Sequence, residues 1–414
     1  MLRFFTIMLI ILFGVQHLVA QEIVQWRGPY RSGYFPETGL KKSWPENGPE
    51  LILEIEGFGG GYSSPVIYND IIYVTGMKDS VDVVSAYDLR GNKKWETEYA
   101  KSWYRTYPET RCTPTIENGY LYLAGGEGEV CCIDAKTGDI KWTVSALKKY
   151  NGEVGKYGVA ESLLLTDQAV IYCTGGNETT IIALNKDDGR LVWKSGSIGG
   201  LKVYVSPALV SHNGKQMIIA QTSNDLFGVD ATNGEILWTY DIIHYHTGRQ
   251  GKTNVTNTPL YLNGEIFTTS GYNHPGLMLK LSDDGRSVSL KWRNDSLDCH
   301  IGGVVLVDGY IYGSSWEHNG YGKWTCVNWN TGELMYHYDW INKGSVIYAD
   351  GHLYCYEEKS GTIALVKPDP VGFNIISAFR VEKGNGPYWS HPAIFDGILV
   401  LRHGDVLFLY DIKQ

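Results

Sequence analysis

The feature that most constrains this chain is a sequence pattern that recurs from residue 64 almost to the C-terminal end. A small residue, usually followed by Pro, precedes a few apolar residues, an Asn/Asp-Gly pair and an alternating apolar-aromatic segment. Such pairs between alternating segments are strong signals for tight β-hairpins. The eight copies have their turns at Asn69-Asp70, Asn118-Gly119, Asp167, Asn213-Gly214, Asn263-Gly264, Asp308-Gly309, Asp350-Gly351 and Asp396-Gly397.

A second pattern follows each of the first seven copies: an Asp-type residue, a Gly turn and a strand that usually begins at Trp. The best examples are residues 134–142 and 230–238, with their turns at Gly138 and Gly234. The turn glycines are 40 to 51 residues apart, a period typical of the four-stranded blades of a β-propeller. The tryptophans that begin these strands are Trp95, Trp142, Trp193, Trp238 and Trp292.

The two patterns do not occur in equal number. The chain ends after the eighth hairpin, so the last blade lacks its outer strand, whereas residues 51–55 have strand character and precede the first copy. Pairing of residues 51–55 with the outer edge of the last blade would close the ring and remove an exposed sheet edge. The sequence therefore predicts an all-β, eight-bladed β-propeller of four-stranded antiparallel blades, closed by an N-terminal strand that completes the C-terminal blade. A ring of seven blades, or one with a degenerate eighth blade, is the alternative.

The Asp-Ala-x-x-Gly-x-x-x-Trp repeats at residues 134–142 and 230–238 resemble the tryptophan-docking repeats of quinoprotein dehydrogenases, which use pyrroloquinoline quinone (PQQ). They are equally similar to the non-enzymatic propeller of the outer-membrane β-barrel assembly machinery. The opening Trp26-Arg27-Gly28-Pro29, with Arg31 and Gly33, looks like the start of secreted bacterial proteins of the PQQ-like repeat family. The resemblance implies the fold, but these repeats are structural and do not by themselves imply an activity.

The first twenty residues have the features of an export signal. Arg3 gives a positive start, residues 4–15 are apolar, and Ala20 is a small residue at the expected cleavage site. The apolar run is too short to span a bilayer, and an uncleaved N-terminal anchor is the alternative. We therefore expect a signal peptide at residues 1–20, no transmembrane segment after its removal, and a periplasmic or secreted protein.

Composition favours one domain rather than several. The 49 Gly, 29 Tyr and 13 Trp are spread along the chain without a linker, as in all-β repeat folds. We expect a single propeller domain at residues 21–414, in which residues 21–57 form an N-terminal arm and the closing strand. The net charge of −9 argues against a nucleic-acid partner. A closed ring has no free sheet edge, so we expect a monomer.

The seven cysteines do not indicate a disulfide framework, because an odd number cannot pair completely. Cys173 and Cys355 follow a Tyr at equivalent repeat positions and look like small buried hydrophobic residues. The adjacent Cys131-Cys132 pair is a candidate redox site, because a disulfide of adjacent cysteines lies against the quinone in the dehydrogenases that the repeats resemble. Neighbouring side chains of a strand point to opposite faces, so packing within a predicted strand is the favoured interpretation.

Local motifs for metal binding or catalysis are not recognisable in the sequence. His244 and His246 could place two imidazoles on one face of an extended segment, but no third ligand has a suitable spacing. Exposed loop histidines are therefore favoured, and no metal site is predicted. No phosphate-binding loop, nucleophile elbow or zinc-protease helix occurs. The calcium ligands and catalytic Asp of the quinoprotein dehydrogenases cannot be placed by a local motif.

The loops that enter the innermost strands are informative as a set, because they converge on one face of a propeller around the central channel. They combine aromatic residues with Arg, His and carboxylates, which suits a polar, ring-bearing ligand such as a sugar. An ordinary polar rim is the alternative. Glu161 and His391 could act as an acid–base pair if they faced each other across the channel. The candidate ligand-binding residues are Arg105, Arg111, Glu161, Tyr204, His246, Arg249, His300, Trp316, Trp389 and His391.

Three functions follow as hypotheses. The favoured one is a non-catalytic binding or scaffolding protein of the cell envelope, whose partner is an envelope protein or a glycan, because the repeats are intact and no catalytic constellation is recognisable. The second is a carbohydrate-binding or carbohydrate-active propeller that uses the central funnel. The third is a PQQ-dependent alcohol or sugar dehydrogenase, with PQQ and calcium as cofactors; the first two hypotheses require no cofactor.

Overall fold

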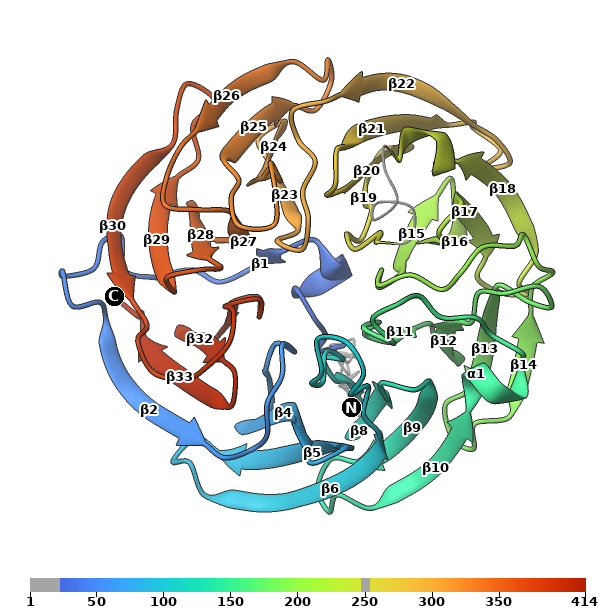
Figure 1. Ribbon diagram of the computed structural model, residues 1–414, viewed down its shortest axis with the longest axis horizontal. Helices are drawn as coiled ribbons and strands as arrows, with labels where there is room; N and C mark the ends of the chain where they lie inside the picture. Colours follow the sequence, from blue (N-terminus) through green and yellow to red (C-terminus); the bar gives the residue numbers. More distant parts are fainter. Residues whose placement is uncertain (1–22, 247–253) are drawn as a thin grey trace, which may run out of the picture.

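The computed structural model describes residues 23–246 and 254–414, and the expected signal peptide lies outside them. Eight sheets form a ring around a central channel (Figure 1). Seven of them are built from four consecutive antiparallel strands, and the eighth combines three C-terminal strands with one from the N-terminal part of the chain. The predicted eight-bladed β-propeller is confirmed.

The strands of the first four blades are given from the innermost to the outermost. Blade 1 contains β3 (Val66–Tyr68), β4 (Ile71–Lys78), β5 (Val81–Asp88) and β6 (Lys93–Lys101). Blade 2 contains β7 (Thr115–Glu117), β8 (Tyr120–Ala124), β9 (Glu129–Asp134) and β10 (Ile140–Ser145). Blade 3 contains β11 (Leu164–Leu165), β12 (Ala169–Cys173), β13 (Ile181–Asn185) and β14 (Leu191–Lys194). Blade 4 contains β15 (Ala208–His212), β16 (Lys215–Gln221), β17 (Asp225–Asp230) and β18 (Ile236–Asp241).

The other four blades complete the ring. Blade 5 contains β19 (Leu260–Leu262), β20 (Glu265–Ser270), β21 (His274–Leu281) and β22 (Val288–Asn294). Blade 6 contains β23 (Val304–Val307), β24 (Tyr310–Ser314), β25 (Trp324–Asn328) and β26 (Leu334–Tyr338). Blade 7 contains β27 (Gly344–Ala349), β28 (His352–Glu357), β29 (Thr362–Lys367) and β30 (Asn374–Arg380). Blade 8 contains β31 (Ala393–Phe395), β32 (Ile398–His403), β33 (Val406–Asp411) and β2 (Glu50–Glu56).

The remaining elements are short. They are η1 (Pro29–Arg31), β1 (Tyr34–Phe35), α1 (Ala146–Lys149) and η2 (Ile243–Tyr245). Within residues 23–246 and 254–414, no helix is long and apolar enough to cross a membrane.

The hairpins and strands form as the repeat dictates. In the turn between β7 and β8, Asn118 and Gly119 both have positive φ, 55° and 78°, as a type I′ hairpin turn requires. The middle strands β8 and β9 are almost wholly buried, because neighbouring blades cover both of their faces. The outer strand β10 buries Trp142 and exposes most of its other residues.

Tryptophans of the outer strands join neighbouring blades. The Trp95 indole donates to the carbonyl of Ala135 in the next blade (3.1 Å), and a Cβ on Gly138 would lie only 2.7 Å from the Trp95 ring. This close approach explains the glycine of the repeat. Trp238 differs, because its indole nitrogen lies 3.3 Å from Met217 Sδ in its own blade. The stacking of Trp95 on Gly138 recurs for Trp142 on Gly189, Trp193 on Gly234 and Trp292 on Gly332.

The strand β2 closes the ring by pairing antiparallel with β33, which confirms the predicted closure. Ile55 of β2 is 5 % exposed and packs in a cluster with Val400 and Leu407 of blade 8. Leu53 occupies the place that tryptophan has elsewhere, since a Cβ on Gly91 of blade 1 would lie 2.9 Å from its side chain. The closing strand therefore reproduces the contact between blades without the aromatic residue.

The N-terminal arm lies inside the channel, where β1 adds in parallel to the inner edge of β27 (Figure 1). The Arg27 guanidinium donates to the carbonyls of Val304 (2.7 Å) and Val346 (2.9 Å), in blades 6 and 7. Arg31 donates to the carbonyl of Ser162 (2.6 Å), on the opposite side. Burial lowers the pKa of both arginines to about 10, so both remain charged at neutral pH. The arm thus ties distant blades together across the ring.

Candidate functional site

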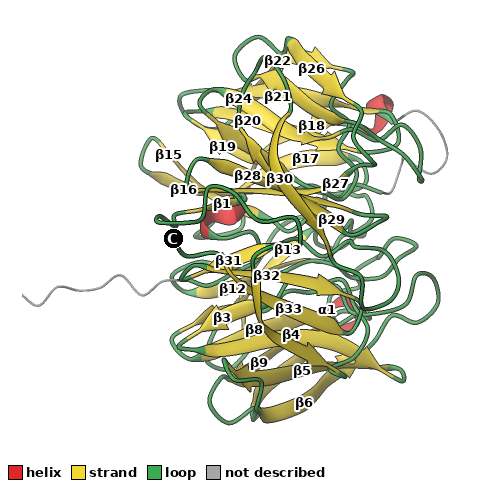
Figure 2. Cartoon of the chain, turned by 90° about the vertical axis from the view of Figure 1, so that its left-hand side faces the viewer, coloured by secondary structure: helices red, strands yellow, loops and turns green. Residues whose placement is uncertain are grey.

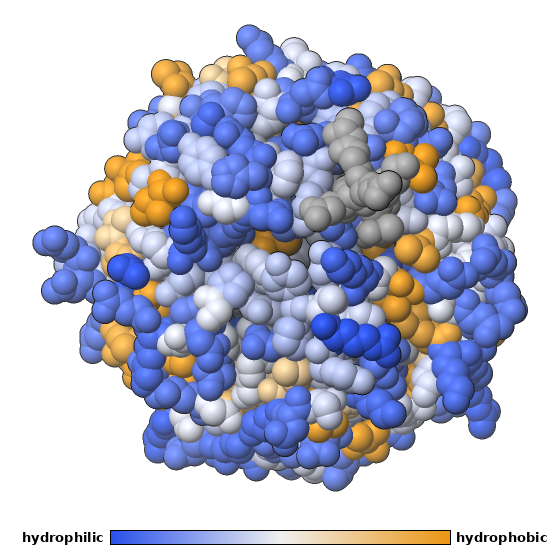
Figure 3. All heavy atoms as spheres, in the orientation of Figure 1, coloured by the Kyte–Doolittle hydropathy of each residue, from blue (hydrophilic) through white to orange (hydrophobic). Residues whose placement is uncertain are grey.

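A cavity of about 410 Å³ occupies the centre of the ring. The arm fills the channel on the face that carries β1 and the C-terminus (Figure 2), so the cavity opens on the opposite face, where Figure 3 shows a central depression. Ligand pockets commonly have volumes of roughly 300–1,000 Å³. The described residues that line this cavity are Trp26, Tyr62, Tyr107, Arg111, Lys156, Tyr157, Ala160, Ser162, Tyr204, Ser206, Asn254, Thr256, Tyr272, His300, Ile301, Asn319, Glu358, Trp389 and His391.

One side of the cavity is a continuous series of aromatic rings. Trp389 lies between Tyr62 and Tyr107, with ring centroids 4.9 and 5.8 Å away. Tyr107 contacts Tyr157 at 5.7 Å, and Tyr157 contacts Tyr204 at 5.8 Å. These rings come from the entry loops of five neighbouring blades, so the series exists only because the ring is closed. It offers apolar faces next to hydroxyl groups.

Three of the tyrosine hydroxyls that line the cavity are protonated at neutral pH. Burial raises the pKa of Tyr62, Tyr204 and Tyr272 to about 12 in each case. The Tyr204 hydroxyl accepts a hydrogen bond from the backbone N–H of Tyr157 (3.0 Å), which leaves its own proton for another acceptor. The wall can therefore donate hydrogen bonds to a ligand.

Two cations line the cavity without an ion-pair partner. The Arg111 guanidinium donates to the carbonyls of Tyr157 (2.9 Å) and Tyr107. Lys156 places its Nζ 5.4 Å from the centroid of the Tyr157 ring. In the part of the chain that the structure describes, no carboxylate lies within ion-pair distance of either cation. Burial lowers the pKa of Arg111, but a guanidinium remains charged at neutral pH.

The floor of the cavity is formed by Trp26 and His391, whose rings meet edge to face at 5.1 Å. Arg27 Nη1 donates to His391 Nδ1 (2.9 Å), and His391 Nε2 donates to the carbonyl of Ile301 (2.8 Å). A guanidinium can only donate, so the imidazole carries its proton on Nε2. Burial, assisted by Arg27, lowers the pKa of His391 to about 3. The ring is therefore neutral, and both of its nitrogens are occupied.

Glu358 is the single carboxylate among the described lining residues. It forms a buried ion pair with Lys343 (2.5 Å), which also donates to the carbonyl of Asn319 (3.0 Å). Burial raises the pKa of Glu358, and Lys343 opposes the shift. Because Glu358 and Lys343 neutralise each other, Arg111 and Lys156 are the remaining charges among the described lining residues, and the carboxylates of Asp82 and Glu109 act on Arg111 from beyond ion-pair distance.

The structure brings several sequence-predicted site residues together and separates others. Arg105 lies on the rim, with a side chain 59 % exposed and paired with Glu127 (3.3 Å). Trp316 packs against the lining residue Tyr272, with ring centroids 5.0 Å apart. Arg249 lies outside the described residues. Those on the cavity wall are Arg111, Tyr204, His300, Trp389 and His391.

Glu161 does not lie on the cavity wall. Its carboxylate forms an ion pair with Lys202, and both side chains are fully buried. A buried carboxylate requires such a counter-ion, since an isolated charge in the interior is strongly unfavourable. The acid–base pair of Glu161 with His391 that the sequence suggested is therefore not formed.

The two histidines considered as metal ligands have different surroundings. His244 is exposed, with its Nδ1 3.5 Å from the carboxylate of Asp241. His246 is buried, and its ring centroid lies 4.6 Å from that of His274. The expectation of two exposed loop histidines is thus wrong for His246, because its side chain packs against His274 of blade 5.

Some lining residues were not among the predicted ones, and the repeat contains a signal for one of them. Tyr62 stands three residues before the Pro of its blade entry, the position that Arg111, Tyr204 and Trp389 have in theirs. This position faces the cavity in most blades. Trp26 comes from the arm, and Tyr272 and Glu358 come from connections between the second and third strands of their blades, where no spacing rule pointed to the channel.

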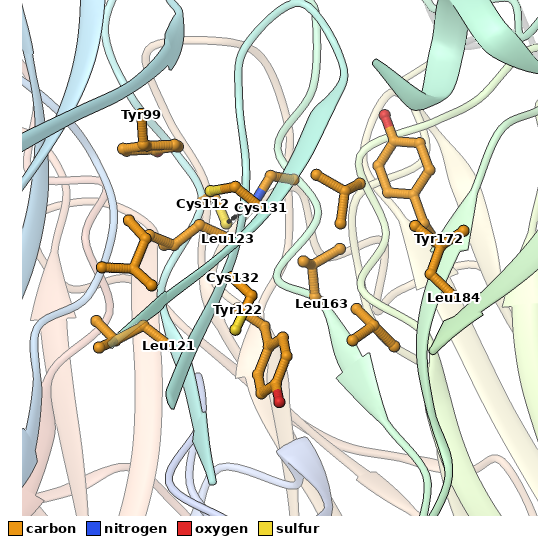
Figure 4. Close-up of a cluster of buried hydrophobic side chains, with 14 of the residues drawn as sticks. Tyr99, Cys112, Leu121, Tyr122, Leu123, Cys131, Cys132, Leu163, Tyr172 and Leu184 are labelled. Carbon is orange, nitrogen blue, oxygen red and sulfur yellow. Dashed lines mark hydrogen bonds between the residues drawn. The ribbon is translucent and has the colours of Figure 1, made fainter. Parts of the chain in front are cut away.

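The adjacent cysteines lie in the hydrophobic core between blades and not at the cavity (Figure 4). Cys131 and Cys132 are neighbours in β9 and point to opposite faces, Cys131 toward Cys112 and Cys132 toward Tyr122. All seven cysteines are buried free thiols. Burial raises the pKa of Cys132 to about 12, which makes it a poor nucleophile. The pair fills the strand, as the strand interpretation predicted.

Comparison with known families supports the repeat analysis. The family model described as outer membrane protein assembly factor BamB matches residues 80–365, more than half of the chain. The chain belongs to this family.

Curated relatives of this BamB-family chain include enzymes as well as assembly factors. It is 30 % identical over 207 residues to a quinoprotein ethanol dehydrogenase of Pseudomonas putida, covering 47 % of this chain and 32 % of the dehydrogenase. It is 25 % identical over 167 residues to the outer membrane protein assembly factor BamB of Nitrosomonas eutropha, covering 40 % of this chain and 35 % of that protein. The chain spans about a third of the length of the curated relatives that it matches most strongly.

Solved structures with a similar fold likewise include both an assembly factor and a dehydrogenase. BamB from Moraxella catarrhalis matches with a TM-score of 0.62 and 14 % identity, over 88 % of this chain and 99 % of that one. The quinohemoprotein alcohol dehydrogenase from Comamonas testosteroni matches with a TM-score of 0.66 and 11 % identity, over 93 % and 79 %. At these identities the likeness shows the fold alone.

The residues of this BamB-family chain do not match a quinone–calcium centre. Calcium takes six to eight oxygen ligands, mostly from carboxylates and carbonyls. Among residues 23–246 and 254–414, no three His, Cys, Asp or Glu side chains gather as a metal site, and Glu358 is already paired with Lys343. The cations and aromatic rings could hold a planar carboxylate, but Cys131 and Cys132 lie in the core instead of against it.

Proposed function

We propose that this chain is a non-catalytic binding protein of the cell envelope, and that its ligand enters the central cavity. The observation that carries the proposal is the cavity itself, which is closed at one end by the chain's own arm and lined by aromatic rings and by two cations that form no salt bridge with a described residue. Such a combination of apolar faces and a few polar anchors is typical of ligand pockets.

The same geometry argues against acid–base catalysis in the cavity. His391 is neutral and bonded at both nitrogens, and Glu358 is held by Lys343. His391 therefore has no free nitrogen with which to exchange a proton with a ligand, as a general acid or base must. Binding without chemistry is the simplest use of these groups.

Membership of the BamB family and the expected signal peptide support a periplasmic or secreted location. A relative named as an outer membrane protein assembly factor supports an envelope component as partner. A PQQ-dependent dehydrogenase is the second candidate, favoured by the 30 % identity to a quinoprotein ethanol dehydrogenase.

One titration separates the two candidates. Purified protein is mixed with PQQ, with and without calcium, and followed by absorbance, thermal shift and dye-linked oxidation of alcohols. We expect no bound quinone spectrum and no oxidation, while immobilised protein captures a defined component of an envelope extract that a Trp389→Ala variant does not. A quinone complex that oxidises alcohols would overturn the proposal and establish the dehydrogenase.

A further inference from the structure

We propose that the central cavity binds the terminal residue of an acidic sugar, with its carboxylate held by Arg111 and Lys156 and its pyranose ring stacked on Trp389. The inference rests on the proposed binding function and specifies the chemistry of the ligand.

The charge of the cavity selects an anion. Arg111 uses two donor groups on the carbonyls of Tyr107 and Tyr157, and a guanidinium has five N–H donors, so others remain for a ligand. The planar fork of Arg matches a carboxylate, and Lys156 adds a point charge on the same wall. The nearby Glu358 is neutralised by Lys343 and does not cancel this attraction, and Asp82 and Glu109 act on Arg111 only from beyond ion-pair distance.

The series of aromatic side chains favours a ligand that contains a ring. Trp389 is flanked by Tyr62 and Tyr107 at centroid distances of 4.9 and 5.8 Å, so its position is fixed by packing. The C–H face of a pyranose is apolar and lies well on such a ring, while its hydroxyls point sideways to polar groups. A flexible acyclic acid would gain little from this surface.

Neutral polar groups around the cations favour a sugar over a flat aromatic acid. The Ser162 hydroxyl accepts from the backbone N–H of Thr113 (3.1 Å), and the Ser206 hydroxyl accepts from that of Ser162 (2.9 Å), so each serine keeps a proton to donate. Asn254 and Tyr272, which hydrogen-bond each other, also line the cavity. A planar acid would leave the serine hydroxyls unpaired in a desolvated pocket, which is unfavourable. Sugar hydroxyls would satisfy them.

The closed floor of the cavity admits only the end of a polysaccharide chain. Trp26 and His391 close the channel, and Arg27 beneath them is bonded to the backbone of blades 6 and 7. A polysaccharide therefore cannot pass through the ring. A volume of about 410 Å³ suits one or two sugar units.

The test is calorimetric titration of the purified protein with D-glucuronate and D-galacturonate, and with their neutral counterparts glucose and galactose. We expect the acids to bind at least about tenfold more tightly than the neutral sugars, since a charge-assisted contact is lost in the latter. Affinity for the acids should fall as salt is raised from about 50 to about 300 mM.

Variants locate the contact. Lys156→Gln and Trp389→Ala should each weaken uronate binding roughly tenfold or more. Arg105→Gln and Tyr104→Ser are the matched controls, because both side chains are exposed on the rim loop and do not line the cavity, and they should change affinity by less than about twofold. Arg111→Gln also removes hydrogen bonds to the backbone, so the folding of this variant must be checked. The contribution of charge is therefore measured with Lys156→Gln.

Several results would overturn the inference. Equal affinity for acidic and neutral sugars would exclude the carboxylate contact, and tighter binding of benzoate than of uronates would replace the sugar with a planar acid. If no uronate binds but the protein still captures an envelope protein through the cavity, the sugar inference fails and the proposed binding function stands. Quinone-dependent alcohol oxidation would instead remove the proposed function.

Discussion

At the residue scale, two buried arginines hold the arm, and two glycines make room for one of them, Arg27. The Arg27 guanidinium lies between Gly33 and Gly303, and a Cβ on either would collide with it. Both glycines have positive φ, 77° and 68°, which L side chains rarely adopt. Hydrogen bonds to the carbonyls of Gly302, Val304 and Val346 and to His391 then fix the guanidinium. The two glycines therefore leave room for the guanidinium and also allow the positive φ of the backbone.

Replacing Gly303 by Ala tests this arrangement. The substitution adds left-handed strain of about 1–2 kcal/mol and displaces Arg27, which should cost at least about 2 kcal/mol more in free energy of unfolding. Gly309→Ala is the control, because it has a positive φ of 82° but open space around its Cβ, and it should show the strain alone. Urea unfolding followed by tryptophan fluorescence measures both. Equal losses would mean that Arg27 is not confined by Gly303.

His391 makes stability depend on pH in a defined direction. Its pKa is lowered from 6.5 to about 3 by burial and by Arg27, so the unfolded chain binds a proton that the folded chain does not. The neutral ring's contribution is present above pH 6.5 and is lost as the pH falls toward 3. His391→Gln should therefore destabilise the protein most at pH 7, and the difference from wild type should shrink by up to about 1.4 kcal/mol per pH unit below 6.5.

The control for His391 is His244→Gln. His244 has a side chain 58 % exposed, so its replacement should change the free energy of unfolding little at any pH between 7 and 5. If the difference in free energy of unfolding between wild type and His391→Gln stayed constant over this range, the folded and unfolded states would bind the same number of protons at His391, contrary to the prediction.

At the element scale, β2 is the strand that turns an open sequence of blades into a ring. It lies about 350 residues before the strand with which it pairs, so its pairing closes a very long loop. The apolar surface of Ile55 and the main-chain ladder to β33 compensate for that loss of chain entropy. Without β2, β33 would present an open edge.

Ile55→Ala should lower the free energy of unfolding by about 2–4 kcal/mol, because it leaves a cavity in the cluster that seals blade 8. Ile52→Ala on the same strand is the matched control, since Ile52 is 47 % exposed and its loss should change stability by less than about 0.5 kcal/mol. Thermal and urea unfolding give both values. A similar loss for the two variants would show that closure does not depend on this buried contact.

At the scale of the whole molecule, ring closure converts a repeat position into a site. Tyr62, Arg111, Tyr204 and Trp389 stand at one place in four different blade entries, far apart in sequence. Closure brings them to a single cavity, where they form an aromatic and cationic wall. The function proposed here thus belongs to the ring and not to any one blade.

The sequence by itself determined the repeat, the number of blades and the closing strand, because hairpin turns, alternating strands and the Trp–Gly contact are local or act between neighbouring copies. It also indicated which loops converge on the channel. It could not show that Glu161 is neutralised by Lys202, that His246 is buried, or that Trp26 closes the floor. These outcomes depend on which side chains meet across the closed ring, where burial of a charge or an imidazole is decided by partners distant in sequence, and only the tertiary structure brings those partners together.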